Sequence, residues 1–163
     1  GSKVGSVTTD NSYVCGGVEV SSDDSTLYTH SVSNLAAVSV ESFDISSGTR
    51  NWIVNRNGAD AGLALSPDGS KLYAHGESTG FNGVHGCIID TASGTVDHEV
   101  GTTLGYWGRN SFFSDDSSTV YANQEQGALG GSHPLLEIDV STGSTTDISG
   151  QFPTSDNWTA LAR

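Results

Sequence analysis

Two histidines stand at matching places in the chain and could bind a metal. His30 and His75 each follow a tyrosine by two residues, and Asn123 holds the third such place. Imidazole and carboxylate groups bind divalent metals, so the two histidines with Glu77, Glu125 or Asp60 would make a metal site. Their spacing fits neither an HxxxH nor an HExxH motif. A polar position copied between repeats is the favoured interpretation, so we predict no cofactor and keep a divalent metal as the alternative.

Aromatic and basic residues in or beside the expected loops form a second group. Exposed rings of Trp107 and Trp158 would stack on a sugar or anchor a protein partner. Packing in the core is the favoured alternative for both tryptophans. The candidate binding face then contains the following residues: His30, His75, Asn123, Glu77, Asp60, Trp107, Arg109 and Trp158.

The sequence contains no motif that is typical of nucleophilic catalysis. Serine is abundant, but no Gly-x-Ser-x-Gly elbow occurs. Cys15 and Cys87 form no CxxC pair, and they fall in different repeats, which favours two free or buried thiols over a disulfide. Adjacent aspartates at 23–24 and 115–116 lack the spacing of a calcium loop and fit turn chemistry instead. No catalytic residue is predicted, and the sequence favours a protein that is not an enzyme.

Two motifs recur in step along the chain, and together they predict the fold. The first reads Ser-Pro-Asp-Gly-Ser-Lys-Leu-Tyr at 66–73 and returns in looser form at 21–28 and 114–121. Its tyrosines are 45 and 48 residues apart. The second motif, Asp-x-x-Ser/Thr-Gly-Thr/Ser, follows each copy of the first and keeps nearly the same period: 44–49, 90–95 and 139–144.

Both motifs are turns between antiparallel strands. Proline fixes φ, aspartate bonds to its own backbone, and glycine accepts a positive φ. Four short strands in each period of about 45 residues are typical of a β-propeller blade. We therefore predict an all-β single domain over 1–163, with three complete blades and parts of a fourth. The expected units are blades at 16–58, 59–105 and 106–152, a leading outer strand at 3–9 and a trailing inner strand at 154–163.

The repeats resemble the YVTN/WD-like family of propeller repeats. The second blade is the closest match, with Ser66 to Tyr73, then Ile88 to Val96, then Val100-Gly101. The resemblance covers nearly the whole chain and implies a propeller fold. Proteins with such repeats serve as scaffolds, surface-layer proteins, lactonases and quinoprotein dehydrogenases, so the resemblance does not specify a function.

The number of blades raises the question of closure. Propellers close with about four to eight blades, and an unclosed stack exposes the apolar faces of its end blades. We expect the chain to be part of a longer protein, or to associate with a second copy of itself or with another propeller-bearing chain that completes the ring. A closed small four-bladed ring, in which the lone strands at 3–9 and 154–163 meet, is the alternative.

Composition excludes several function classes. The formal net charge is −13, from 6 Lys and Arg against 19 Asp and Glu, and such a surface repels nucleic acid. No apolar run approaches the roughly 20 residues of a membrane span. We predict a noncatalytic propeller module of an extracellular or cell-surface protein, which binds a partner or assembles through its loop face and open blade edges. The alternatives are half of a lactonase-like or quinoprotein-like enzyme, completed by another chain, and a carbohydrate-binding propeller.

Overall fold

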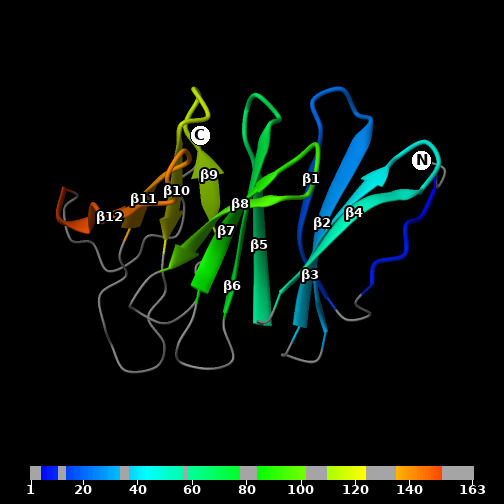
Figure 1. Cartoon of the computed structure of the whole chain (residues 1–163), viewed down its shortest axis with the longest axis horizontal. Coiled ribbons are helices and arrows are strands. Elements are labelled where there is room, and N and C mark those ends of the chain that lie inside the picture. The colour runs from blue at the N-terminus through cyan, green and yellow to red at the C-terminus, as the bar shows by residue number, and fades with distance from the viewer. Residues whose placement is uncertain are drawn as a thin grey trace.

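Three four-stranded antiparallel sheets make up the described part of the chain (Figure 1). The computed structural model describes residues 5–10, 14–33, 37–56, 59–77, 84–101, 110–123 and 135–151. In each sheet the strands lie in chain order, each hydrogen-bonded to the next. Within these ranges, no helix has the length and hydropathy that a membrane crossing requires.

Each sheet corresponds to one predicted blade. The first sheet contains β1 (Val14–Val20), β2 (Thr26–Ser33), β3 (Ala37–Asp44) and β4 (Arg50–Arg56). The second contains β5 (Ala59–Leu65), β6 (Lys71–Glu77), β7 (Val84–Asp90) and β8 (Val96–Gly101). The third contains β9 (Ser111–Phe113), β10 (Thr119–Asn123), β11 (Leu135–Asp139) and β12 (Thr145–Asp147), followed by a short 3₁₀ helix, η1 (Ser149–Gln151). The all-β fold and the four-stranded units are confirmed.

The aspartates of the first motif hold the turn between the first two strands of each blade. In the second blade, Asp68 Oδ1 accepts hydrogen bonds from Ser66 Oγ at 2.7 Å and from the Ser70 amide at 2.9 Å. Asp116 makes the same pair of contacts in the third blade, and these lower the pKa of its carboxyl to about 2. In the second blade, Gly69 lies between Asp68 and Ser70 and has a φ of 74°. The turn interpretation of the acidic motifs therefore holds in the structure.

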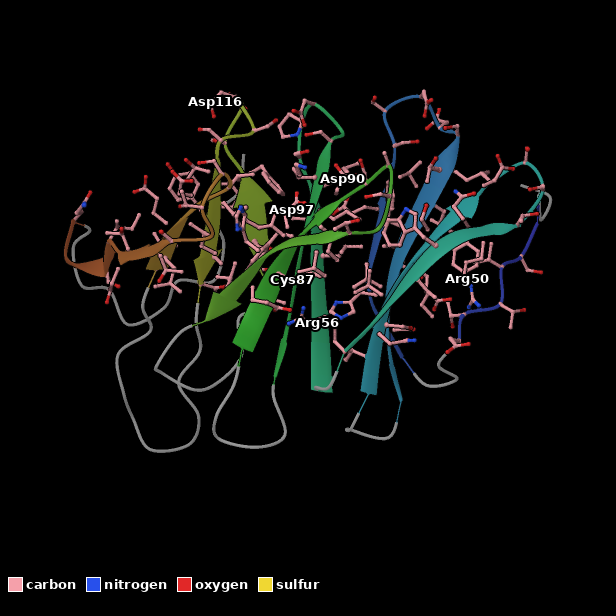
Figure 2. All side chains as sticks on the ribbon, viewed as in Figure 1. Arg50, Arg56, Cys87, Asp90, Asp97 and Asp116 are labelled. Atoms are coloured by element: carbon pink, nitrogen blue, oxygen red, sulfur yellow. The ribbon has the colours of Figure 1, made fainter. Side chains whose placement is uncertain are left out.

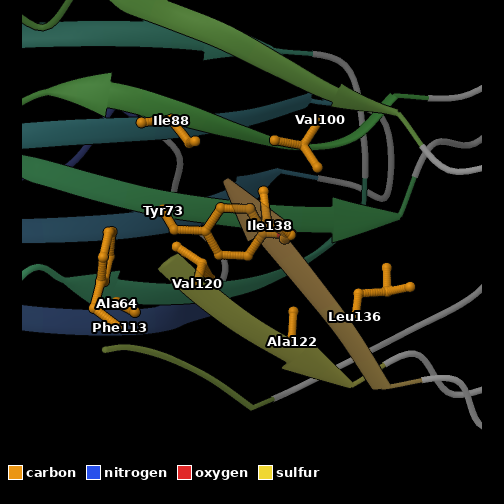
Figure 3. Packing of buried hydrophobic residues seen from close by; sticks show 9 residues of the cluster. All are labelled: Ala64, Tyr73, Ile88, Val100, Phe113, Val120, Ala122, Leu136 and Ile138. Carbon is orange, nitrogen blue, oxygen red and sulfur yellow. The ribbon is translucent and has the colours of Figure 1, made fainter. Parts of the chain in front are cut away.

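Apolar side chains pack the sheets face to face. Tyr28 and Val40 of the first sheet pack against Leu72, Cys87 and Ile89 of the second. Nine buried apolar and aromatic residues pack together between the second and third sheets (Figure 3): Ala64, Tyr73, Ile88, Val100, Phe113, Val120, Ala122, Leu136 and Ile138. Each blade thus has one face for the preceding blade and one for the following blade.

The first and third sheets lie at opposite ends of the row (Figure 1). The described residues therefore form an open row of three blades, with no closed ring among them. The trailing inner strand expected at 154–163 lies outside the described residues. In the described part of the leading strand expected at 3–9, residues 5–9 form no strand. An outer strand needs the third strand of its own blade beside it for a hydrogen-bond ladder, and no described strand holds that place.

Residues 5–10 nevertheless lie where the outer strand of a preceding blade belongs. A Cβ added to Gly94 would meet the Trp52 ring of β4, and one added to Gly143 would meet His98 of β8. Both glycines are the turn glycines of the second motif, and each packs on the outer strand of the blade before it. The equivalent glycine of the first blade, Gly48, has Ser6 O as its neighbour, 3.6 Å from the added Cβ. We call residues 5–10 the strap.

Candidate functional site

The three repeat positions singled out in the sequence are equivalent in the structure. His30, His75 and Asn123 lie in β2, β6 and β10, and the cross-strand partners of the two histidines are Gly17 and Gly62. The other predicted site residues fall elsewhere. Asp60 and Glu77 lie in β5 and β6 with side chains outside the described part, and three further residues lie outside the described residues altogether: Trp107, Arg109 and Trp158.

His30 links the first blade to the second. Its ring is buried, and Nδ1 lies 3.0 Å from the backbone oxygen of Gly62 in β5. Because a carbonyl oxygen only accepts, Nδ1 carries the hydrogen and Nε2 is left with a lone pair. That Nε2 is buried and has no hydrogen-bond partner in the described part of the chain. The recurring histidine therefore has a structural task, consistent with a polar position copied between blades.

His75 packs over the backbone of its own blade. Its ring stacks on Tyr73 with centroids 5.6 Å apart, and its Nε2 is also buried without a partner among the described residues. The absence of a side chain at Gly62 makes room for the ring, because a Cβ at that position would lie only 2.0 Å from His75 Nε2. Gly62 therefore accommodates both histidines, one at its carbonyl and one over its Cα.

Both imidazoles are neutral at pH 7. Burial is the main cause that lowers the pKa of His30 to about 4, and the nearby Arg56 lowers it further. Burial likewise lowers the pKa of His75 to about 4, with a smaller contribution from His30. Neutral imidazole is the form that binds a metal, but the described ranges contain no cluster of three or more His, Cys, Asp or Glu side chains that could hold one.

The fit between Gly62 and His75 leads to a testable prediction. Gly62→Ala is expected to lower the free energy of unfolding by about 1–3 kcal/mol, because the new methyl group overlaps the buried ring. Combining it with His75→Asn, which installs the residue found at the third repeat position, should recover most of the loss. Urea unfolding followed by circular dichroism measures both. A double variant whose loss equals the sum of the two single losses would contradict this geometry.

The junction of the first two blades contains a cluster of polar side chains that no sequence motif indicated. Arg56 of β4 donates to both carboxylate oxygens of Glu99 in β8, with Nη1–Oε1 at 2.8 Å and Nη2–Oε2 at 2.5 Å. Figure 2 shows Arg56 and Cys87 at this junction, where the guanidinium also contacts the thiol. Cys87 is a free, buried thiol, and burial raises its pKa to about 12. The thiol is therefore protonated and unreactive at pH 7, and the group ties two blades together.

Glu41 was also missed by sequence reasoning, and it lies on the face of the first blade that points away from the second. Its side chain is fully buried. It accepts hydrogen bonds from the Asp10 amide of the strap at 3.0 and 3.2 Å, from Ser39 Oγ at 3.0 Å and from Arg50 Nη1 at 3.1 Å. The strand register gives Cys87 and Leu136 as its equivalents. Aligning the three repeats of this chain would have indicated Glu41, because the other two repeats have uncharged residues at that position.

The inner half of the same face is open. Val18 and Val20 of β1 are 55% and 42% exposed. In the third blade, the equivalent of Val20 is Phe113, which is buried against the second blade. Leu27 is half-buried, whereas its equivalent Leu72 is fully buried. The first blade thus presents an apolar surface of the kind that meets a neighbouring blade elsewhere in the row.

The far face of the third blade shows the same contrast. Tyr28 and Tyr73, the repeat tyrosines of the first two blades, are 5% and 4% exposed because the following blade covers them. Tyr121 holds the same place in the third blade and is half-buried, with Phe112 beside it at a ring-centroid distance of 5.3 Å. At these positions both end faces therefore carry the apolar residues of a blade junction, and no described blade covers them.

Known structures share this architecture. TolB from Acinetobacter baumannii matches over 80% of this chain and 31% of its own, with 16% identity and a TM-score of 0.56. Hydrazine synthase from Kuenenia stuttgartiensis matches over 86% and 38%, with 19% identity and a TM-score of 0.61. A protein assigned as a 6-phosphogluconolactonase from Bacteroides fragilis matches over 81% and 37%, with 22% identity and a TM-score of 0.50. These structures are β-propellers.

The chain has a β-propeller fold. It spans less than half the length of each of the three structures. No protein-family model matches the sequence, and no curated protein matches it either. At these identities the similarity shows the fold alone, so the relation to YVTN/WD-like repeats stays a resemblance and the activities of the three proteins do not carry over.

Proposed function

We propose that this chain is a noncatalytic propeller module whose two end faces each bind a further blade. The supporting observation is the contrast between equivalent positions: Tyr73 is buried under the next blade, whereas Tyr121 is half-buried with no described blade beside it. Exposed Val18 and Val20 give the first blade a matching surface. Burial of such apolar area drives association between folded surfaces.

The loop face contributes less to this proposal than the sequence indicated. His30 and His75 are buried and neutral, and one of them already joins two blades. The half-enzyme alternative depends on His30, His75 and Arg109, and the carbohydrate-binding alternative depends on Trp107 and Trp158. No described contact favours either alternative. An extracellular or cell-surface location remains part of the proposal, supported by the net charge of −13 and the polar composition.

A hydrophobic dye tests whether the end faces are free to bind. We expect 1-anilinonaphthalene-8-sulfonate to bind the folded chain, and the Val18→Ser/Val20→Ser variant to bind less dye at unchanged secondary structure. Val140→Ser serves as the control, because Val140 is partly buried against the junction of the second and third blades and not on an end face. A folded wild-type chain that binds no dye would contradict the proposal.

A further inference from the structure

We infer that the far face of the third blade binds a propeller blade of another protein chain, and that this partner blade supplies an arginine to Glu137. A second copy of this chain does not meet that requirement. The inference rests on the proposed function above and specifies the partner of one of the two end faces.

Glu137 lies on the far face, in the row of side chains that a following blade would cover. The strand register places Phe112, Tyr121 and Glu137 side by side on three neighbouring strands, and Thr146 comes next on β12. Directly paired residues of an antiparallel sheet point to the same face. The carboxylate of Glu137 therefore shares a surface with the two aromatic rings.

The place of Glu137 is fully buried in the two blades that have a following blade. In the second blade it is taken by Ile88, which pairs with the repeat tyrosine and is 0% exposed. In the first blade it is taken by Ser42, which is 1% exposed. Glu137 itself is half-buried. A blade that docks on the far face in the same way would therefore remove the Glu137 carboxylate from water.

A carboxylate buried at a blade junction requires a cation beside it, because an ionised group without a partner opposes association. The described part of the chain contains three Lys and Arg side chains, namely Arg50, Arg56 and Lys71, and each already pairs with at least one other carboxylate. None of the three forms an ion pair with Glu137. The cation must therefore come from the partner.

The aromatic rings beside Glu137 favour arginine over lysine as that cation. Phe112 and Tyr121 have ring centroids 5.3 Å apart on this face. A guanidinium group can stack on an aromatic ring and still donate two parallel hydrogen bonds to a carboxylate, whereas an ammonium group lacks this planar fork. The same kind of pair already links two blades of this chain, where Arg56 donates to both carboxylate oxygens of Glu99.

The end face of the first blade, which a second copy would present, has no arginine available for Glu137. The basic side chain described on that face is Arg50, whose Nη1 lies 3.1 Å from Glu41 Oε2 and 3.5 Å from Asp10 Oδ1. Glu41 also holds the place of Leu136, which belongs to the buried cluster between the second and third blades. Head-to-tail pairing would therefore add Glu137 to a face that already has two carboxylates around one arginine, which opposes association.

Peptide binding to the full chain tests the requirement for arginine. The probes are the N-acetylated and C-amidated tripeptides Leu-Arg-Leu, Leu-Lys-Leu and Leu-citrulline-Leu, in which citrulline keeps the shape of arginine without its charge. Nuclear magnetic resonance of the tyrosine-labelled chain reads binding at the Tyr121 ring, at about 0.15 M salt to screen long-range attraction. We expect the arginine peptide to bind at least about fivefold more tightly than the citrulline peptide and at least about twofold more tightly than the lysine peptide.

Two variants of the full chain locate the effect. Glu137→Gln keeps the shape of the side chain and should weaken binding of the arginine peptide at least about fivefold while leaving the citrulline peptide unchanged. Asp24→Asn is the matched control, because it removes one negative charge from an exposed turn of the first blade. This control should leave all three affinities as they are in the wild type.

The outcomes separate this inference from the proposed function. Equal affinities for the arginine and citrulline peptides, or an arginine affinity that survives Glu137→Gln, would overturn the role of Glu137 and leave an apolar end face intact. Equal affinities for the arginine and lysine peptides would overturn the choice of arginine. If no peptide shifts the Tyr121 resonances while the chain still binds the hydrophobic dye, the inference fails and the proposed function stands. Absence of both peptide and dye binding would contradict both.

Discussion

Tyr73→Ala is expected to lower the free energy of unfolding by about 3–5 kcal/mol, whereas Tyr121→Ala at the equivalent position should cost about 1 kcal/mol or less. Tyr73 is buried between the second and third blades with Ala64 and Ile88, so its removal leaves a cavity. Tyr121 is half-buried and has Phe112 beside it, so its removal leaves little unfilled space. Urea unfolding followed by circular dichroism gives both values.

The repeat provides its own control for this comparison. Tyr28→Ala tests the junction of the first two blades, where Tyr28 packs against Trp52 at a ring-centroid distance of 6.0 Å, and should resemble Tyr73→Ala. All three substitutions remove the same side chain from the same strand position. Similar losses at Tyr73 and Tyr121 would mean that the far face of the third blade is covered in the isolated chain.

Acidification from pH 6.5 to pH 4 is expected to destabilise the chain by on the order of 3 kcal/mol for each buried histidine. Burial lowers the pKa of His30 and His75 to about 4, below the ordinary value of 6.5. Between pH 6.5 and pH 4 the histidines bind protons in the unfolded chain but remain neutral in the folded chain. The free energy of unfolding is therefore highest above pH 6.5 and falls as the pH is lowered. Unfolding free energies from urea titrations at half-unit pH intervals measure the effect.

A double variant isolates the histidines from the carboxylates. His30→Asn with His75→Asn installs the residue of the third blade at both places and should flatten the profile between pH 6.5 and about 5. Hydrogen bonds from serines bring the pKa of Asp23 and Asp116 to about 2, so the stability that these turn aspartates contribute is lost only below about pH 5, in the variant as in the wild type. A wild-type profile that is already flat in this window would show that the two imidazoles accept protons in the folded chain.

Much of the fold could be predicted because the turns are encoded locally. The segment from Ser66 to Tyr73 specifies its hairpin through side chains that bond within five residues. The same chemistry recurs around Asp23 and Asp116, so the strands between the turns followed with their order and antiparallel pairing. The equivalence of His30, His75 and Asn123 also follows from the repeat period alone.

The rest depends on contacts between blades, which no local motif encodes. Glu41 is significant only because it lies on an end face beside the strap, and Arg56 only because Glu99 of the next blade is within reach. The register also shifts near Gly17, and such bulges change which side chains share a face. The alternation of side chains along a strand therefore predicts which face of the sheet a residue lies on only within stretches that contain no bulge. Residues 5–9 of the strap form no strand, because no described strand lies beside them to complete a hydrogen-bond ladder.

Hydroxyl-radical footprinting of the repeat tyrosines tests the central claim that the end faces are unfilled blade junctions. Reaction rates report the solvent exposure of each ring in the intact chain, read by mass spectrometry. The structure predicts that Tyr121 reacts several times faster than Tyr28 and Tyr73, and that Val18 and Val20 are also modified. Equal protection of the three tyrosines in a monomeric chain would contradict the open row of three blades.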